Sequence, residues 1–278
     1  MSAADSGPSW NSPQDAAAFA APPAKPSGNS PAAGKRIEYL AALRFATQHP
    51  EWLKNVLMFG LCLLIPVLGV IIQYGYTYEI TELQHRRPGS QYPSFDFNRL
   101  AVYVTRGVWA FLIFFVVQTI LSVVYQILFQ GTMFGTMAAV QANEEVGTII
   151  AAVVIPAVII GFLSLIIGIT LVVRPLMLRA GLSQDFAQTV KFPWLRDFLK
   201  RMWLETLLIN LFTMLVTLVL MPFGLVLCCV GMAFVSAFIA IAGAHLDWQL
   251  YELYLARGGE PIPLKPLPGD VPPVVTGQ

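Results

Sequence analysis

Long apolar segments dominate the hydrophobic pattern of this chain. Four stretches contain no Asp, Glu, Lys or Arg, and they are Asn55–Tyr78, Gly107–Asn143, Val146–Val173 and Thr206–Leu246. A helix needs about 20 mostly apolar residues to cross the hydrocarbon core of a bilayer, and each stretch is longer than that. Helices of soluble proteins bury one face and carry charges on the other. The pattern therefore predicts an all-α integral membrane protein.

Two of the four stretches contain a proline that is followed within three residues by a glycine. Pro66 and Gly69 lie inside the first stretch, and Pro222 and Gly224 lie inside the last. Because an interior proline removes a helical hydrogen bond and clashes with the preceding turn, each break is either a kink or a hairpin tip. The last stretch is about twice as long as one span requires, which favours two helices meeting near Pro222. The first helix of the other hairpin, Leu53–Ile65, rises only about 20 Å. That hairpin is therefore either re-entrant or placed in a locally thinned bilayer.

The 17 Lys and Arg residues decide between kinks and hairpins. Cytoplasmic segments of membrane proteins collect Lys and Arg. If both broken stretches are hairpins, every basic segment falls on one side, and only the segment with Glu144 and Glu145 falls on the other. Single kinked spans would divide the basic residues between the two sides. The charges therefore predict a polytopic bundle of about six helices, with two proline-tipped hairpins and both termini in the cytoplasm.

The segments that flank the apolar stretches are polar or amphipathic. Residues 1–35 are rich in Ala, Pro and Ser, lack the apolar centre of a secretory signal peptide, and are expected to form a disordered tail. The apolar residues of Arg36–His49 share one helix face, which fits either an interfacial helix or a helix packed on the rest of the protein. Phe192–Arg201 is also amphipathic. We therefore expect a membrane helical domain over residues 36–257 and a flexible, proline-rich tail over residues 258–278.

Composition narrows the classes of function. Of the 278 residues, 56% are hydrophobic and only 12% are charged, with a net charge of +1. There is no basic block suited to neutralising phosphates, so no nucleic-acid partner is expected. The three cysteines lie in apolar stretches, where they are expected to act as small packing residues. Nothing in their positions suggests a disulfide framework or a zinc site. No HExxH, GxSxG or phosphate-loop motif occurs, and we expect no enzyme activity, cofactor or metal.

A series of motifs in the first half of the chain resembles a known family. The motifs are Trp52 and Asn55 before the first apolar segment, Pro66 with Gly69, Gly75-Tyr76 followed by Glu79, Pro93 with Phe95-Asp96-Phe97, and Arg106-Gly107 with Trp109. Their order and spacing resemble the bacterial membrane-protein family named domain of unknown function 4013, especially its planctomycete-like members. The resemblance extends to about residue 260, and Ala110 departs from it where proline is expected. It implies a six-helix domain in the inner (cytoplasmic) membrane, and it implies no activity.

Polar side chains follow each hairpin at its cytoplasmic end. They are Gln73, Glu79 and Glu82 after the first hairpin, and His245, Asp247 and Glu252 after the second. Ionisable groups near membrane depth are costly and are default functional candidates. If the hairpins pack side by side, these side chains form a polar vestibule for an ion, a proton or a lipid head group. The alternative is ordinary helix ends, where charges reach water and Tyr and Trp form the aromatic belt.

The same end of the protein carries many basic residues. They are Arg99, Arg106, Arg174, Arg179, Arg196, Lys200 and Arg201. They either bind anionic lipid head groups or only fix the topology. Our first functional hypothesis is a structural or accessory protein that scaffolds an unidentified protein partner in the lipid bilayer. The alternative is a small transporter or channel whose proline-broken helices act as gates. A continuous polar cavity would favour transport, and a solid bundle would favour scaffolding.

Overall fold

A computed structural model describes residues 36–226 and 228–265. Within these ranges the chain forms eight α-helices, α2 to α9, and one short 3-10 helix, η2. The all-α prediction is confirmed for this part of the chain. The predicted disordered tail, residues 1–35, lies outside the described residues, as do residues 266–278 of the predicted C-terminal tail.

The first hairpin consists of two helices that meet at the first proline. Helix α3 runs from Trp52 to Leu63, and α4 runs from Leu68 to Arg86. Pro66 lies between them, where it has no helical hydrogen bond to break. A Cβ atom at Gly69 would lie 2.4 Å from the carbonyl oxygen of Cys62, so only glycine lets α4 turn back this tightly onto α3.

Two further glycines set the distance between α4 and α5. After η2 (Phe97–Arg99), α5 runs from Leu100 to Ala142. A Cβ atom at Gly75 would lie 1.8 Å from the carbonyl oxygen of Tyr103, and one at Gly107 would lie 1.8 Å from that of Ile71. The two backbones therefore touch, as small residues allow in membrane helices.

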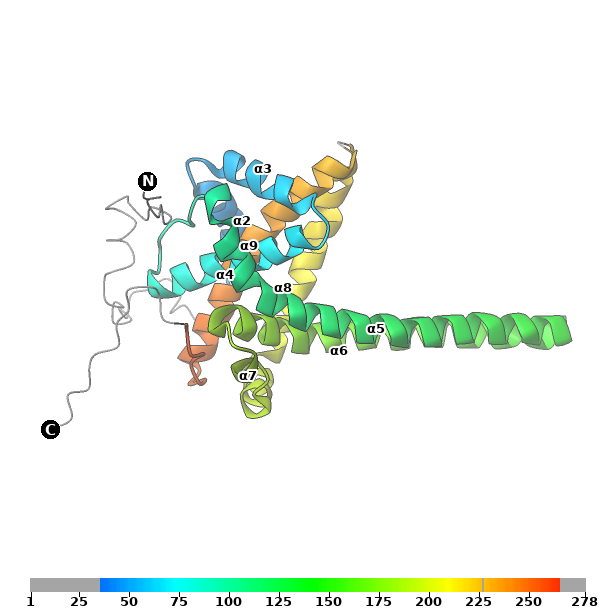
Figure 1. The fold of residues 1–278 in the computed structure, drawn as a ribbon. Helices are drawn as coiled ribbons and strands as arrows, with labels where there is room; N and C mark the ends of the chain where they lie inside the picture. The colour runs from blue at the N-terminus through cyan, green and yellow to red at the C-terminus, as the bar shows by residue number, and fades with distance from the viewer. Residues whose placement is uncertain (1–35, 227, 266–278) are drawn as a thin grey trace, which may run out of the picture.

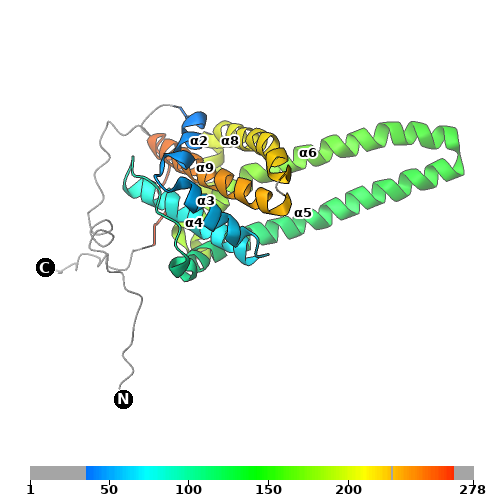
Figure 2. The ribbon, with the colours of Figure 1, turned by 90° about the horizontal axis from the view of Figure 1, so that it is seen from above.

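Helices α5 and α6 form a long antiparallel hairpin. Helix α6 runs from Glu144 to Ser183, and Asn143 caps its first turn, accepting a hydrogen bond from the backbone N–H of Val146 at 3.1 Å. The rings of Tyr125 and Phe162 pack 4.8 Å apart across the pair. The hairpin projects far beyond the other helices (Figures 1 and 2). Both helices are exposed over much of their length.

Helices α8 and α9 form the second hairpin, whose reversal differs from the prediction. After α7 (Phe186–Thr189), α8 runs from Phe192 to Val226 and α9 from Cys228 to Ala256. Pro222 lies inside α8 and not at its end. A membrane helix tolerates an interior proline, because neighbouring helices and local adjustments satisfy the backbone groups that the proline frees. Gly224 is not the tip either. It is buried in α8, where an added Cβ atom would lie 3.1 Å from the backbone of Gly231.

Helix α9 is the centre of the body, because it packs against α2, α3, α4 and α8. Helix α2 runs from Tyr39 to Gln48 and buries Ala42, Phe45 and Ala46, so the amphipathic segment packs on the protein. The described start of the predicted tail also packs on the body, since Ile262 is buried and its N–H donates to the Tyr251 hydroxyl at 2.8 Å. Cys62 is buried, and the side chains of Cys228 and Cys229 lie outside the described residues.

In the described part of the chain, four helices are long and apolar enough to cross a membrane, where the sequence predicted about six. They are Phe97–Ala142, Glu144–Ser183, Phe192–Val226 and Val230–Ala256. Helix α3 is apolar but has only 12 residues, or about 18 Å. Helix α4 has 19 residues, and it buries Glu79 and Glu82. Helices α3 and α4 of the first hairpin are therefore not among these four candidate spans. The four candidate spans indicate a multi-pass membrane protein.

Candidate functional site

Helices α4 and α9 lie side by side and bring together polar residues from both hairpins. The Nδ1 atom of His245 lies 2.9 Å from Gln84 Oε1, and the Nδ1 atom of His85 lies 2.5 Å from Glu252 Oε1. Because a carbonyl oxygen can only accept, His245 donates from Nδ1. The Thr81 hydroxyl donates to the carbonyl oxygen of Ala244 at 3.2 Å. The predicted meeting of the two polar segments is thus present in the structure.

The two carboxylates of α4 pair with arginines of η2, α5 and α4. Glu79 is 6% exposed, and its Oε1 atom accepts from Arg99 Nη2 at 2.6 Å. Glu82 is 3% exposed, and it accepts from Arg86 Nε at 2.8 Å and from Arg106 Nη2. These ion pairs tie α4 to η2 through Arg99 and to α5 through Arg106. Both acids lie within the helix bundle and are largely removed from water.

A third acid, which is largely but not fully buried, joins three helices. Asp247 of α9 accepts from Arg174 Nε of α6 at 2.7 Å, and Arg174 Nη1 donates to Asn210 Oδ1 of α8 at 2.8 Å. The side chains of Arg174 and Asp247 are each 16% exposed. This contact holds the base of the α5–α6 hairpin to the α8–α9 hairpin.

Gln73 lies apart from these pairs. It is half-buried and precedes Glu79 by almost two turns of α4. Its recorded contact is through its backbone carbonyl oxygen, which accepts from the Thr77 hydroxyl at 2.9 Å. Of the six predicted vestibule residues, the structure thus places five at the junctions of α4 with α5 and of α9 with α4 and α6.

A cleft of about 210 Å³ opens beside these pairs, between α2, α9 and the segment after α4. Its lining includes His245, whose ring lies between those of Phe45 and Trp248 at 4.4 and 5.0 Å. Gln84 and Gln249 also line it, and Gln249 is tied to the backbone of Glu38 by two hydrogen bonds. The four vestibule acids are not part of this lining. The cleft therefore reaches the edge of the polar cluster and stops short of its ion pairs.

Sequence reasoning missed the pairing of the basic residues. Arg99, Arg106 and Arg174 each contact a buried acid, whereas the sequence suggested lipid binding or topology control. The fully buried guanidinium of Arg179 lies 4.6 Å from the Trp194 ring centroid, and its Nε donates to the carbonyl oxygen of Gln188 at 2.5 Å. The only sign of this pairing in the sequence is that residues 79–106 contain both acidic and basic side chains.

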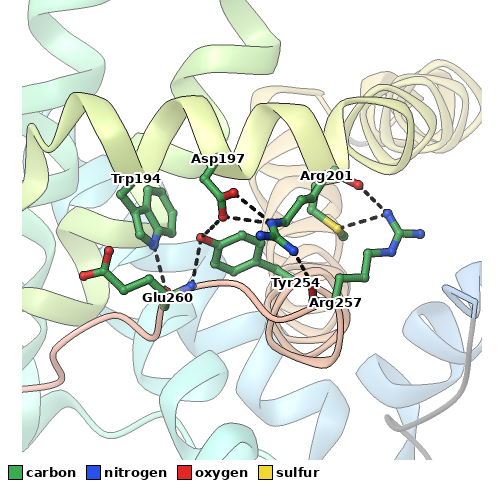
Figure 3. A network of polar contacts seen from close by, with 7 residues as sticks. Trp194, Asp197, Arg201, Tyr254, Arg257 and Glu260 are labelled. Atoms are coloured by element: carbon green, nitrogen blue, oxygen red, sulfur yellow. Dashed lines mark hydrogen bonds and ion pairs between the residues drawn. The ribbon is translucent and has the colours of Figure 1, made fainter.

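A second polar network lies at the start of α8 and the end of α9 (Figure 3). Asp197 accepts from Arg201 Nε at 2.9 Å and from the Tyr254 hydroxyl at 3.0 Å. The guanidiniums of Arg201 and Arg257 each donate to the other's backbone carbonyl oxygen. The indole N–H of Trp194 donates to the carbonyl oxygen of Glu260 at 2.9 Å. These contacts hold the chain after α9 against α8. They could not be predicted from the sequence, because the residues that they join are far apart along the chain.

Asn55 has a defined structural role. It is fully buried, its Oδ1 atom accepts from the Phe95 backbone N–H at 3.1 Å, and its Nδ2 atom lies 3.2 Å from His49 Nδ1. The Glu51 N–H donates to the same ring nitrogen at 3.0 Å. Burial lowers the pKa of His49 from its usual value of 6.5, which favours the neutral ring and keeps Nδ1 able to accept. Among the described residues, no group of three or more His, Cys, Asp or Glu side chains could hold a metal ion.

Within the residues that the structure describes, four long apolar helices define a multi-pass, all-α membrane protein. The chain belongs to the family described as protein of unknown function DUF4013, which it matches over residues 58–243. Trp52 and Asn55 precede the matched range, so this part of the expected resemblance lies outside it. A search of curated proteins and a search of solved structures each found no match.

Proposed function

We propose that the protein is a structural or accessory component of the bacterial inner membrane, which scaffolds other components there. The observation that carries the proposal is the pairing of Glu79, Glu82 and Asp247 with arginines of neighbouring helices. A carboxylate that moves an ion or a proton must exchange with water or substrate. Carboxylates enclosed by arginines instead hold helices together, because separating such a pair in a low dielectric is costly.

The proposed topology follows from the charges. The basic residues of α4, α8 and the loops beside them lie at the end opposite the α5–α6 tip, where Glu144 and Glu145 stand. By the positive-inside rule, the basic end faces the cytoplasm and the tip faces away from it. We propose four full crossings with α3–α4 as a re-entrant hairpin. Four crossings, like the six of the sequence prediction, keep both termini in the cytoplasm, where the tails can engage a protein partner.

Reconstitution into liposomes separates this role from transport. We expect ion and solute fluxes to equal those of empty liposomes, and the variant Glu79→Gln/Glu82→Gln to behave as the wild type does. An exposed pair variant, Glu144→Gln/Glu145→Gln, is the matched control for charge removal. A protein-dependent flux that only the first variant abolishes would contradict the proposal and favour the transporter alternative.

Affinity capture from native membranes tests the scaffolding role itself. The full chain, tagged at one terminus and crosslinked before solubilisation, should recover the same protein partners in independent preparations. An unrelated multi-pass protein with the same tag is the control. A recovered set that matches this control would contradict a scaffolding role.

The cleft beside His245 is a structural feature that favours transport. It opens at the polar end and places an imidazole between two aromatic rings. If the flux assay shows transport, this cleft is the expected entrance, and His245→Gln should reduce the flux.

A further inference from the structure

Helix α5 carries a row of polar side chains on its outer face. Gln118, Ser122, Gln126 and Gln130 follow one another at intervals of four residues and are all exposed. Residues four apart lie on the same face of a helix. The side of α5 toward α6 is different, since Thr136 is buried there and Tyr125 contacts Phe162. Gln126 and Gln130 are exposed and lie outside the α5–α6 contact, whereas Gln118, seven residues from Tyr125, is on the same face as that ring.

The middle of this row lies at the depth of the hydrocarbon. The segment of α6 from Glu144 to Arg174 rises about 45 Å, close to the thickness of a bilayer with its head-group regions. Tyr125 pairs with Phe162 about halfway along that segment. Gln126 and Gln130 are thus near the midplane of a bilayer that this hairpin crosses.

The hydrogen bond between these two glutamines leaves the NH2 group of one and the carbonyl oxygen of the other available. Gln130 Nε2 donates to Gln126 Oε1 at 2.5 Å. The Nε2 group of Gln126 can still donate, and the Oε1 atom of Gln130 can still accept. Lipid tails can do neither, so an exposed amide at this depth is costly until another polar group meets it.

A second copy of this chain supplies both missing partners. In a two-fold pair, the same patch meets itself, so the donor of one copy's Gln126 faces the acceptor of the other copy's Gln130. Interhelical amide hydrogen bonds of this kind stabilise helix association in membranes. The exposed side chains of Phe129 and Met133 lie beside the glutamines on α5 and can pack across the pair. We infer that the outer face of α5 is a homodimer interface within the bilayer, held by Gln126 and Gln130 of two copies.

The inference requires the hairpin to cross the bilayer, and it is independent of the proposed scaffolding role. Full-length protein carrying either of two fluorophores is reconstituted into liposomes over a range of protein-to-lipid ratios, and dimers are counted by energy transfer. The wild type should dimerise, and Gln126→Leu/Gln130→Leu should lower the dimer affinity about tenfold or more. Ser164→Val/Thr170→Val, which removes two exposed hydroxyls from α6, should leave it unchanged. Equal dimerisation of wild type and the glutamine variant, or a monomeric wild type at every ratio, would overturn the inference.

Crosslinking gives a second readout that keeps most of the face intact. In a background with Cys62, Cys228 and Cys229 replaced by Ala, Gln126→Cys should form an intermolecular disulfide with an oxidant. Ile160→Cys, on an exposed position of α6, should not. Efficient crosslinking at position 160 with none at 126 would place the contact on the other helix and contradict the proposed interface.

Discussion

Buried charges that neutralise one another are the main feature at the scale of residues. The side chain of Glu82 is 4% exposed and that of Arg106 is 10% exposed. Each charge therefore replaces the solvation by water that the other loses on burial. The position of Glu82 near membrane depth could be predicted from its place after an apolar stretch. Its partner could not, because Arg106 lies on another helix and the packing of α4 on α5 decides which arginine is near.

The Glu82–Arg106 pair gives the prediction at this scale. Glu82→Gln should lower the free energy of unfolding by about 3–5 kcal/mol, because it leaves Arg106 buried without its counter-charge. The measurement is unfolding by SDS titration in mild detergent. Glu82→Leu/Arg106→Leu should recover part of the loss, since it removes both charges together.

An exposed pair provides the control for that experiment. Glu51 and Lys54 are 3.3 Å apart, and their side chains are about half exposed. Glu51→Gln should cost less than about 1 kcal/mol. If the two glutamate variants lose the same stability, the Glu82 pair does not hold α4 to α5.

Direct backbone contact joins the elements, and glycines make it possible. A Cβ atom at Gly75 would lie 1.8 Å from the carbonyl oxygen of Tyr103, so the backbones of α4 and α5 are in contact there. The position of the second hairpin reversal could not be read from the sequence. Pro222 is accommodated within α8, which continues to Val226, so proline alone did not mark the end of the helix.

Two glycines of α5 give the prediction at the scale of elements. Gly107→Ala should destabilise the protein by about 2 kcal/mol or more, because the new Cβ atom would lie 1.8 Å from the carbonyl oxygen of Ile71. Gly131 is the matched control, since nothing lies within 4 Å of a Cβ atom there. Gly131→Ala should leave stability unchanged or raise it by up to about 1 kcal/mol. Thermal unfolding of both variants in one detergent compares them, and equal stability would contradict the α4–α5 contact.

At the scale of the whole molecule, two long hairpins meet at a body centred on α9. Helices α8 and α9 are inclined to the α5–α6 hairpin (Figure 1), so a bilayer that both cross would be crossed obliquely. Length and charge predicted the membrane class and the long hairpins. Among the described residues, four helices have the length and composition of a span, whereas α3 is short and α4 buries two acids. The inclination depends on the contacts of α9 and had no signal in the sequence.

The topology is the central claim, and cysteine accessibility tests it most directly. In a background without native cysteines, Gln91→Cys and Glu144→Cys are labelled in whole cells by a reagent that cannot cross the inner membrane. Both positions are exposed and lie at opposite ends of the α5–α6 hairpin. We predict that Glu144→Cys is labelled in intact cells, and that Gln91→Cys is labelled only after the inner membrane is permeabilised. Labelling of both positions from the same side would contradict a hairpin that crosses the bilayer.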